Sequence, residues 1–397
     1  MNITNMMPRS VAVNPLALID RIIAELELGA QLYESVTASY EAVAAALAKI
    51  HPELQVSIFP QGSMRLGTTI LHLFGERFDL DMVCSLAISG KIYTPEQVFE
   101  LVWDALGQHD TYRQMRQKKN RCIRIEYAPE CKYYLDIVPA VPDWVISGSL
   151  YVPDRERKVW CPSHPVAYCD KWFKTACKEL PTFRPIMLRN MSAAVVMANA
   201  KTSVEPMPEF GAFEKTPLQR IVQMLKHDRN DHFQNDTAHR PSSILLTTIT
   251  TKSYLESVNR PVDDLLEFVI NVVKGLPEFI YMTGIESVQK YHVLNPVNPN
   301  ENFAECWTGE HYVRFLMWQK RAVARLEKLQ QAKGRGTDVM MNRLSETFGN
   351  NQVIKAARAL GVDANALHDA GELRVSAGVV GTAGASIPAT INFGSDN

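Results

Sequence analysis

The feature that most constrains this chain is a glycine-serine turn followed by two aspartates that lie two positions apart on a predicted strand. Gly62 and Ser63 open a predicted helix, and Asp79 and Asp81 flank Leu80 in the strand. Side chains two apart on a strand point to the same face, so both carboxylates can bind one pair of hard cations. Glycine lets the backbone approach a ligand closely, and the amides at a helix start can bind phosphate. The stretch predicts a metal-dependent site for a nucleoside triphosphate.

A third carboxylate, Asp136, occurs within the predicted strand 133–138, between apolar neighbours. An acid there is unfavourable unless a group on the same face compensates its charge, and bound Mg²⁺ would do so. If the strands are adjacent, Asp79, Asp81 and Asp136 converge on two metal ions. We expect Asp79 and Asp81 to bridge both ions, and Asp136 to hold the ion near the acceptor hydroxyl and assist its deprotonation. The alternative is three unrelated surface aspartates, which the combination with Gly62-Ser63 disfavours.

Composition limits the class of protein. The chain has 397 residues and a formal net charge of −1, from 42 Lys and Arg against 43 Asp and Glu. Proteins that hold long nucleic acid without sequence preference need a basic surface, so small charged ligands fit this balance better. The seven cysteines are scattered and form no CxxC pair, which argues against a disulfide framework or a zinc ribbon. No apolar run is long enough to span a bilayer, and the first residues lack the apolar core of a secretion signal, so we expect a soluble, cytoplasmic protein without membrane contact.

The first half of the chain predicts a small mixed sheet backed by helices. Helical spacing of apolar residues runs from Pro15 to about Ile50, either as one long helix that braces two lobes or as two helices separated near Gly29. Further elements are expected as a helix at 95–107 and strands at 55–59, around the aspartates, at 122–127 and at 133–138. The short connection between the last two strands favours a hairpin. We therefore expect an α+β domain over residues 1–170.

The second half changes to helices. Helical patterns are expected at 167–179, 217–227, 244–254, 262–274 and 309–333, so residues 171–347 form a predicted helical domain. Residues 348–397 are expected to contain a short helix at 351–360 and, in the glycine-rich stretch 376–386, a flexible tail.

At this point the residues resemble a known family. Gln61-Gly62-Ser63, Asp79-Leu80-Asp81 and Asp136 resemble the motif of polymerase-β-like nucleotidyltransferases. The rest of the chain looks like the branch that makes cyclic oligonucleotides, the CD-NTases related to cyclic GMP-AMP synthase and oligoadenylate synthase, in the stretches 152–155, 160–165, 168–173, 217–227, 242–248 and 295–303. The resemblance implies a polymerase-β-like nucleotidyltransferase mixed sheet with flanking helices, an all-helical second lobe, and an active site in the cleft between them.

The resemblance also implies nucleotide-binding roles. Gln61, Gly62 and Ser63 would hold the β- and γ-phosphates. Lys226 matches a helix lysine that such enzymes direct at the donor triphosphate, and its alternative is a solvated helix cation. Ser242 or Ser243 matches a small hydroxyl that meets the triphosphate or the base, with a helix cap as the alternative.

Other residues are assigned less directly. Arg220 and Gln223 could assist Lys226, and Tyr254 either stacks on a base or is buried. The loop 295–302 is interpreted as a structural turn. A local basic cluster is either a solvated face or a contact to ligand phosphates, and comprises Arg113, Arg116, Lys118, Lys119, Arg121 and Arg124.

The implied activity is the condensation of ATP and other nucleoside triphosphates into a cyclic di- or trinucleotide, with release of pyrophosphate and with two Mg²⁺ ions, for which Mn²⁺ can substitute. In the family the product is an alarm signal during phage infection (the CBASS systems) and activates a separate effector. The alternatives are linear addition, as by oligoadenylate or tRNA nucleotidyltransferases, and an inactive nucleotide-binding module. Some relatives bind a HORMA-like activator or are conjugated through their C-terminus. This sequence ends in Asp396-Asn397 without a terminal glycine, so we expect capture of its tail by a partner rather than conjugation.

Overall fold

The computed structural model describes residues 15–48, 55–71, 77–128, 130–182, 207, 215–285, 288–369, 374–376, 379–381 and 385–386. The chain divides into two compact units. The larger comprises Glu27–Asp264 and Asn271–Gln319, and the smaller comprises Met1–Leu26, Leu265–Ile270 and Lys320–Asn397. All predicted site residues lie in the larger unit. The three-domain division at residues 170 and 347 stays a prediction.

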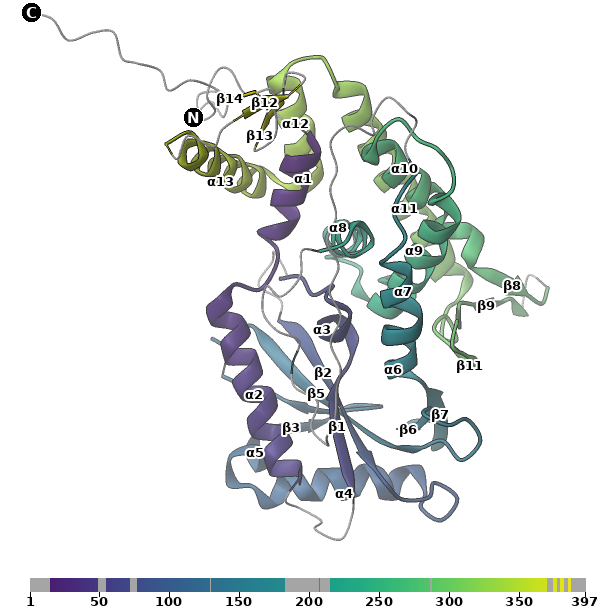
Figure 1. The fold of residues 1–397 in the computed structure, drawn as a ribbon. Coiled ribbons are helices and arrows are strands. Elements are labelled where there is room, and N and C mark those ends of the chain that lie inside the picture. Colours follow the sequence, from purple (N-terminus) through teal and green to yellow (C-terminus); the bar gives the residue numbers. More distant parts are fainter. Residues whose placement is uncertain are drawn as a thin grey trace, which may run out of the picture. The chain divides into compact units, whose positions relative to one another are not determined.

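A mixed sheet forms the base of the larger unit (Figure 1). Its strand order is β1(Val56–Pro60), β2(Phe78–Leu86), β5(Tyr133–Pro142), β4(Ile123–Ile125) and β3(Arg116–Lys118). Strands β2 and β5 are parallel, whereas β1 pairs with β2 and β4 pairs with β5 in antiparallel fashion. Strand β6(Leu150–Asp154) pairs with the end of β5 and with β7(Val159–Ser163). The predicted strands and the β4–β5 hairpin are confirmed.

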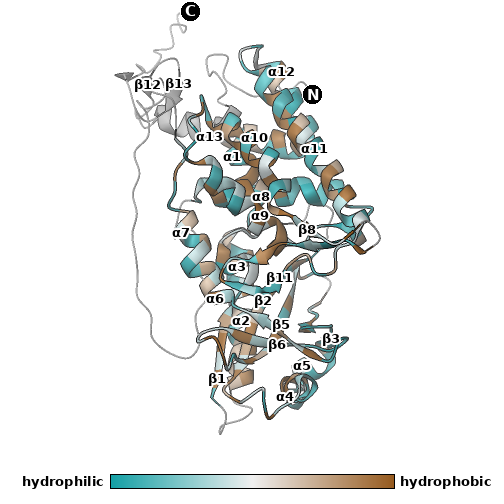
Figure 2. Ribbon diagram, turned by 90° about the vertical axis from the view of Figure 1, so that its right-hand side faces the viewer, coloured by the Kyte–Doolittle hydropathy of each residue, from teal (hydrophilic) through white to brown (hydrophobic). Residues whose placement is uncertain are grey.

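Helices α2(Ala30–Ala48) and α4(Pro95–Gln108) pack against this sheet, and α5(Asp110–Met115) follows α4. Both α2 and α4 carry hydrophobic and hydrophilic residues (Figure 2), and their buried residues join one core with Leu80, Met82, Leu135 and Ile137. Side chains alternate along a strand, so the residues between these apolar positions face the other way. The apolar face therefore anchors the sheet, and the aspartates lie on the opposite face.

The N-terminal helical pattern forms two helices, α1(Pro15–Ala24) and α2. The amide of Leu26 donates to the carbonyl of Ile23, which closes the first helix with a short turn, and the amide of Tyr33 donates to Gly29, which opens the second. Of the two alternatives, one long bracing helix is wrong. Helix α1 belongs to the smaller unit and α2 to the larger.

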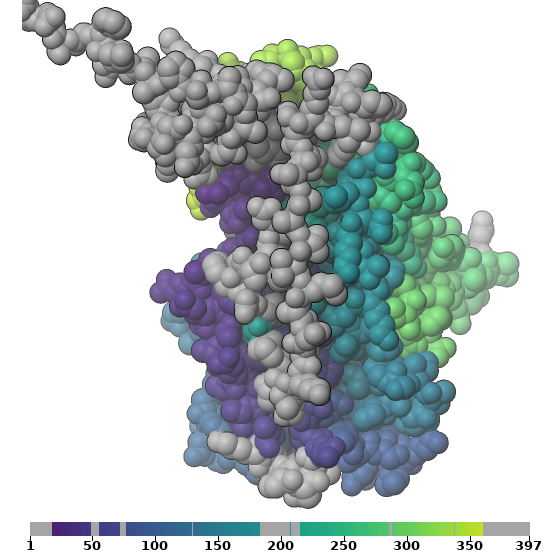
Figure 3. Space-filling model, viewed as in Figure 1, coloured from purple at the N-terminus to yellow at the C-terminus, as the bar shows by residue number. Residues whose placement is uncertain are grey.

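The helical part contains α8(Pro217–His232), α9(Ser243–Ser257), α10(Leu265–Gly275) and α11(Gly309–Ala332). The predicted helix at 167–179 is a π-helical turn, η2(Tyr168–Phe173), between α6(Pro165–Ala167) and α7(Lys174–Ala176). Two short 3₁₀ turns occur at η3(Thr237–His239) and η4(Leu276–Phe279). In the space-filling view, α2 (purple) lies to the left of residues 165–177 (teal) on the visible face (Figure 3).

The prediction of an all-helical second lobe needs correction, because two hairpins interrupt it. They are β8(Tyr281–Thr283) with β9(Lys290–His292) and β10(Leu294–Asn295) with β11(Asn298–Asn302). In the second hairpin the Asn295 side chain accepts a hydrogen bond from the Val297 amide at 3.0 Å, which stabilises a turn. The interpretation of residues 295–302 as a structural turn holds only for residues 296–297, because residues 298–302 form strand β11.

In the smaller unit, α1 packs with α12(Thr337–Phe348) and α13(Asn350–Asp369). Helix α13 is longer than the predicted helix at 351–360. The described residues of the predicted flexible tail form short strands, β12(Arg374–Ser376), β13(Val379–Gly381) and β14(Ala385–Ser386), in the order β13-β12-β14. Valines at 375, 379 and 380 favour this extended pairing. Among the described residues, no helix has the length and apolar character needed to cross a membrane.

Candidate active site

The glycine-serine turn lies directly against the strand that carries the aspartates. Strand β1 leads into the short helix α3(Gly62–Leu66), and the Gln61 amide donates to the carbonyl of Asp81 at 3.0 Å. Gly62 has a φ of +61°, and a Cβ at this position would overlap the Asp81 carboxylate. Both observations require glycine here, because other residues disfavour positive φ and would displace the acid. Gly67, with a φ of +66°, ends α3.

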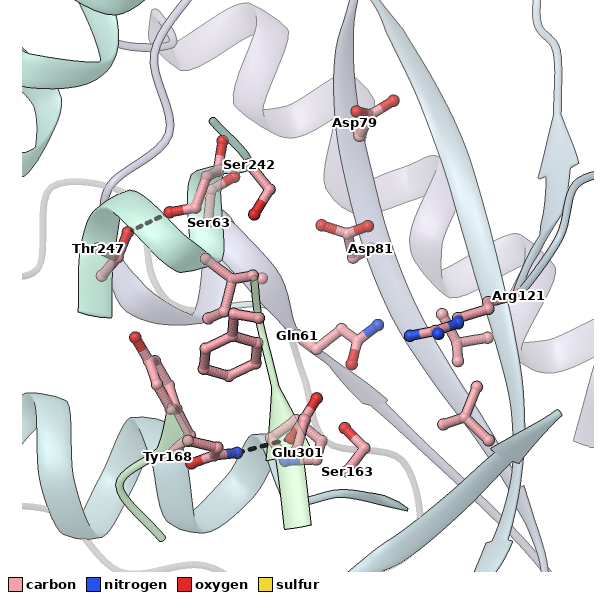
Figure 4. Close-up of a pocket in the computed structure, with 18 of the residues that line it drawn as sticks. Gln61, Ser63, Asp79, Asp81, Arg121, Ser163, Tyr168, Ser242, Thr247 and Glu301 are labelled. Atoms are coloured by element: carbon pink, nitrogen blue, oxygen red, sulfur yellow. Dashed lines mark hydrogen bonds between the residues drawn. The ribbon is translucent and has the colours of Figure 1, made fainter. Parts of the chain in front are cut away.

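The three aspartates lie on one face of two adjacent strands. Asp81 pairs with Asp136 in the parallel register of β2 and β5, and Asp79 lies two residues before Asp81. Asp79 and Asp81 line a cavity (Figure 4), whereas Asp136 is buried, with 6% exposed. The two strands that carry the aspartates are therefore adjacent, which is the condition that the prediction required.

Arg124 on β4 supplies positive charge to this face. Its Nε and Nη2 donate to the two carboxylate oxygens of Asp136 at 2.8 and 2.7 Å, and Nη2 also donates to Asp79 at 2.7 Å. The hydrogen-bonded Asp136 raises the pKa of Arg124, which stays charged. Of the predicted basic cluster, Arg124 thus contacts the carboxylates, while Arg116 packs over the ring of Trp103.

The carboxylates repel each other strongly. Burial, followed by the charges of Asp136 and Asp79, raises the pKa of Asp81 to about 8, although Arg124 and Lys226 oppose the shift. Burial and Asp136 also raise the pKa of Asp79. Arg124 therefore compensates only part of the negative charge, and a further cation would stabilise the ionised form of Asp81.

This donor set fits a hard divalent cation, since carboxylate oxygens are the ligands that Mg²⁺ prefers. In the part of the chain that the structure describes, however, no three His, Cys, Asp or Glu side chains are grouped closely enough to hold a metal ion. Both carboxylate oxygens of Asp136 instead accept hydrogen bonds from Arg124.

Helix α8 contacts the loop that follows α3 through one face. Gln219 donates to the carbonyl of Leu66 at 2.9 Å, and Gln223 donates to the carbonyl of Thr69 at 3.1 Å. Lys226 Nζ donates to the carbonyl and hydroxyl of Thr68 at 3.1 and 3.0 Å. Positions 219, 223 and 226 share one helical face, so this face of the helix holds the last residue of α3 and two residues of the following loop.

Lys226 is 3% exposed and lines the cavity. Burial, with Arg229 as a second cause, lowers the pKa of Lys226 to about 7, while Asp81 acts in the opposite direction. The alternative of a solvated helix cation is therefore wrong. Its role toward a triphosphate stays a prediction.

The other second-half residues divide into two groups. Ser242 caps α9, with its Oγ accepting from the Leu245 amide at 3.3 Å, and both Ser242 and Ser243 line the cavity. Gln223 is fully buried and also bonds Glu27 at 2.8 Å, so it joins structural elements. Tyr254 is buried and donates to the carbonyl of Glu179 at 2.6 Å, which confirms the buried interpretation.

The cavity has a volume of about 900 Å³ and lies within the larger unit. Gln61, Gly62 and Ser63 line it from the sheet side, and Ser242 and Thr247 line it from α9. Its volume lies at the upper end of the range typical of small-molecule sites, roughly 300–1,000 Å³. Except for the buried Asp136, the predicted site residues from both halves of the chain therefore line one chamber.

Arg121 belongs to the predicted basic cluster, whereas two acids of this chamber, Asp154 and Glu301, were not identified from the sequence as site residues. Arg121 donates through Nε and Nη2 to Asp154 at 3.0 and 2.8 Å, and Asp154 is 1% exposed. Burial raises the pKa of Glu301 on β11 to about 7, although a hydrogen bond from Asn295 at 2.7 Å opposes the shift. The sequence offered two signals for these residues. Glu301 is an acid within an asparagine-rich segment, and Asp154 is an aspartate at the end of the strand 150–154.

Comparisons with known proteins find relatives in sequence and in structure. Residues 17–176 match the family model of the second messenger oligonucleotide or dinucleotide synthetase domain. A protein of Roseivirga ehrenbergii named c-di-GMP synthase is 28% identical over 340 residues, which cover 84% of each chain.

Solved structures share the fold. The CD-NTase CdnG of Bradyrhizobium diazoefficiens, in complex with GTP, matches with a TM-score of 0.62 and 19% identity over 87% of this chain and 99% of its own. CdnC of Escherichia coli, in complex with HORMA-deltaN, matches with a TM-score of 0.59 and 13% identity over 84% and 96%. The predicted α+β fold with its mixed sheet is confirmed. Over residues 17–176 this chain is therefore similar to second messenger oligonucleotide or dinucleotide synthetases, and along most of its length it is similar to a c-di-GMP synthase and shares the fold of solved CD-NTases.

Proposed function

We propose that this chain is a metal-dependent nucleotidyltransferase that condenses nucleoside triphosphates, GTP among them, into a cyclic dinucleotide and releases pyrophosphate. The observation that carries the proposal is the arrangement of Asp79, Asp81 and Asp136 on one face of adjacent strands, beside Gly62-Ser63 and at the wall of a nucleotide-sized cavity. The name of the Roseivirga relative and the GTP bound to CdnG support the dinucleotide product and the guanine base.

Asp79, Asp81 and Asp136 would hold two Mg²⁺ ions, for which Mn²⁺ can substitute. The bound ions would supply Lewis-acid activation of a hydroxyl and stabilisation of a leaving pyrophosphate. Their positive charge suits the residues, because Asp81 needs compensation to be ionised at neutral pH. Arg124 would exchange its contact with Asp136 for other partners when the carboxylates bind the metal ions.

The chain's own groups would orient the substrate. Ser63 and the amides at the start of α3 would hold the triphosphate, and Lys226 would donate to it from the opposite wall. Asp136 would accept the proton of the acceptor hydroxyl. Ser242 and Ser243, which line the same chamber, would complete the polar contacts.

The role of the product and a candidate partner are inferred from the resemblance to the CD-NTases. The product would act as an alarm signal during phage infection, in the cytoplasm, through a separate effector. A HORMA-like regulator is a candidate partner, since CdnC was solved in such a complex.

The test incubates the protein with each labelled nucleoside triphosphate and Mg²⁺, beside a variant with Asp79→Ala and Asp81→Ala. We expect a phosphatase-resistant product with the mass of a cyclic dinucleotide, and its loss in the variant. A product that phosphatase degrades indicates linear addition instead. No product with any metal or nucleotide, while nucleotide binding persists, indicates an inactive binding module.

A further inference from the structure

The cavity has a second polar end, away from the aspartates. Figure 4 places Glu301 and Ser163 at the end opposite Asp79, with the guanidinium of Arg121 directed into the cavity. These groups lie on β11, β7 and the turn before β4. The phosphate-binding and metal-binding functions proposed above use none of them.

Arg121 is held rigidly by a buried carboxylate. Both of its bonds to Asp154 end on the same oxygen, and Asp154 is fixed in turn by the backbone amide of Arg157 at 3.0 Å. These bonds use Nε and Nη2, so Nη1 remains for a ligand. A guanidinium that is anchored along one edge and exposed to the cavity along the other is well suited to bind a planar ligand.

Glu301 is also fixed by its surroundings. Asn295, which is 2% exposed and holds its own turn through Val297, donates to one carboxylate oxygen of Glu301 at 2.7 Å. Arg121 lies close enough to lower the pKa of Glu301 against the effect of burial. A carboxylate and a guanidinium thus face the same volume without forming an ion pair.

Aromatic rings line the same region. The Tyr168 side chain is buried, and its hydroxyl forms a hydrogen bond with the Thr248 hydroxyl at 2.8 Å. Its ring packs edge-to-face against the ring of Phe303, with 6.0 Å between the ring centroids. Both rings line the cavity. An apolar ring surface beside a carboxylate and a guanidinium is the environment that a nucleobase requires.

We propose that Glu301 and Arg121 select guanine over adenine, an inference that rests on the proposed nucleotidyltransferase function. A carboxylate only accepts hydrogen bonds, and guanine presents adjacent N1–H and N2–H donors to it. Adenine presents an N1 acceptor at that position, which repels a carboxylate. Arginine matches the O6 and N7 acceptors of guanine, whereas adenine carries an amino donor in place of O6.

The first experiment measures binding, so that it is independent of turnover. Dideoxy-GTP and dideoxy-ITP, which lacks the 2-amino group, are titrated calorimetrically in the presence of Mg²⁺ into the full chain and into Glu301→Gln. We expect the full chain to prefer dideoxy-GTP by about 10- to 100-fold, which is the effect of one hydrogen bond to a charged group. We expect the variant to lose this preference while it still binds dideoxy-ITP. The control is Glu256→Gln, the same substitution on α9 at a carboxylate that pairs with Arg260.

The second experiment tests the role of Arg121 through the N7 atom of guanine. Dideoxy-GTP is compared with its 7-deaza analogue, which lacks the N7 acceptor, and Arg121→Gln should abolish a preference that the full chain shows. A purely structural role would weaken all nucleotides equally in both variants and would leave both ratios unchanged. Unchanged ratios, or a full chain that does not distinguish the analogues, overturn the assignment. Failure of synthesis with intact binding ratios would instead count against the proposed function alone.

Discussion

Replacing Gly62 with alanine tests whether the glycine-serine turn serves Asp81. The added Cβ meets two obstacles, a φ of +61° and direct overlap with the Asp81 carboxylate. The backbone conformation alone costs about 1–2 kcal/mol for an L-residue. The overlap must move either the turn or the carboxylate, and a displacement of about 1 Å at a reacting centre can cost about 100-fold in rate. We therefore expect a modest loss of stability and a disproportionate loss of activity.

The matched control is Gly334→Ala. Gly334 has a φ of +74°, and nothing lies within 4 Å of the position that its Cβ would occupy. Both variants should lose about 1–2 kcal/mol of unfolding free energy, measured with urea. Only Gly62→Ala should lower pyrophosphate release from the nucleoside triphosphates by about 100-fold or more. Equal activity in the two variants would refute the argument that glycine is required by its contact with Asp81.

Three further predictions follow from the buried groups. The folded-state pKa of Lys226 is lowered to about 7, so the unfolded chain binds more protons than the folded chain above that pH. The unfolding free energy should therefore rise between about pH 7 and 10. Lys226→Met should remove this rise in urea titrations without metal. For Asp81 the sign is opposite: with a pKa raised to about 8, the folded chain binds more protons above pH 4, so stability should fall between about pH 4 and 8, and Asp81→Asn should flatten the curve. Tyr254→Phe should lower unfolding free energy by about 0.5–1.5 kcal/mol through its lost bond to Glu179 and leave product formation unchanged, whereas loss of synthesis at full stability would restore the base-stacking interpretation.

The sequence predicted the parts of the site that depend on short-range periodicity. Asp79 and Asp81 share a face because strands repeat every two residues, and the short link before β5 predicted the hairpin that brings Arg124 beside Asp136. The capped start of α8 at Thr216-Pro217 was equally visible, because a capping residue and proline mark a helix start locally.

Other features depend on contacts between residues distant in sequence. Asp154 holds Arg121 across 33 positions, and the partners of Glu301 lie on another strand and turn, so no local pattern distinguishes these residues from surface charges. Lys226 was expected to be either solvated or directed at phosphate. Its observed partner, Thr68, lies 158 residues earlier in the chain. The two hairpins were missed in part because prolines and asparagines mark turns without showing how the flanking residues pair.

The contacts of α8 link the two halves of the proposed site. Gln219, Gln223 and Lys226 hold the residues immediately after α3, so the loop 66–69 takes its shape from the helical part of the unit as well as from the sheet. A lysine that is both buried and bonded to this loop has two competing partners once a triphosphate enters, because phosphate oxygens attract an ammonium more strongly than a hydroxyl does. Binding of the triphosphate would therefore release Thr68 and strengthen the charged form of Lys226 at the same time. Burial and the charge of Arg229 lower the pKa of Lys226, and on the proposed function an anionic substrate would raise it again.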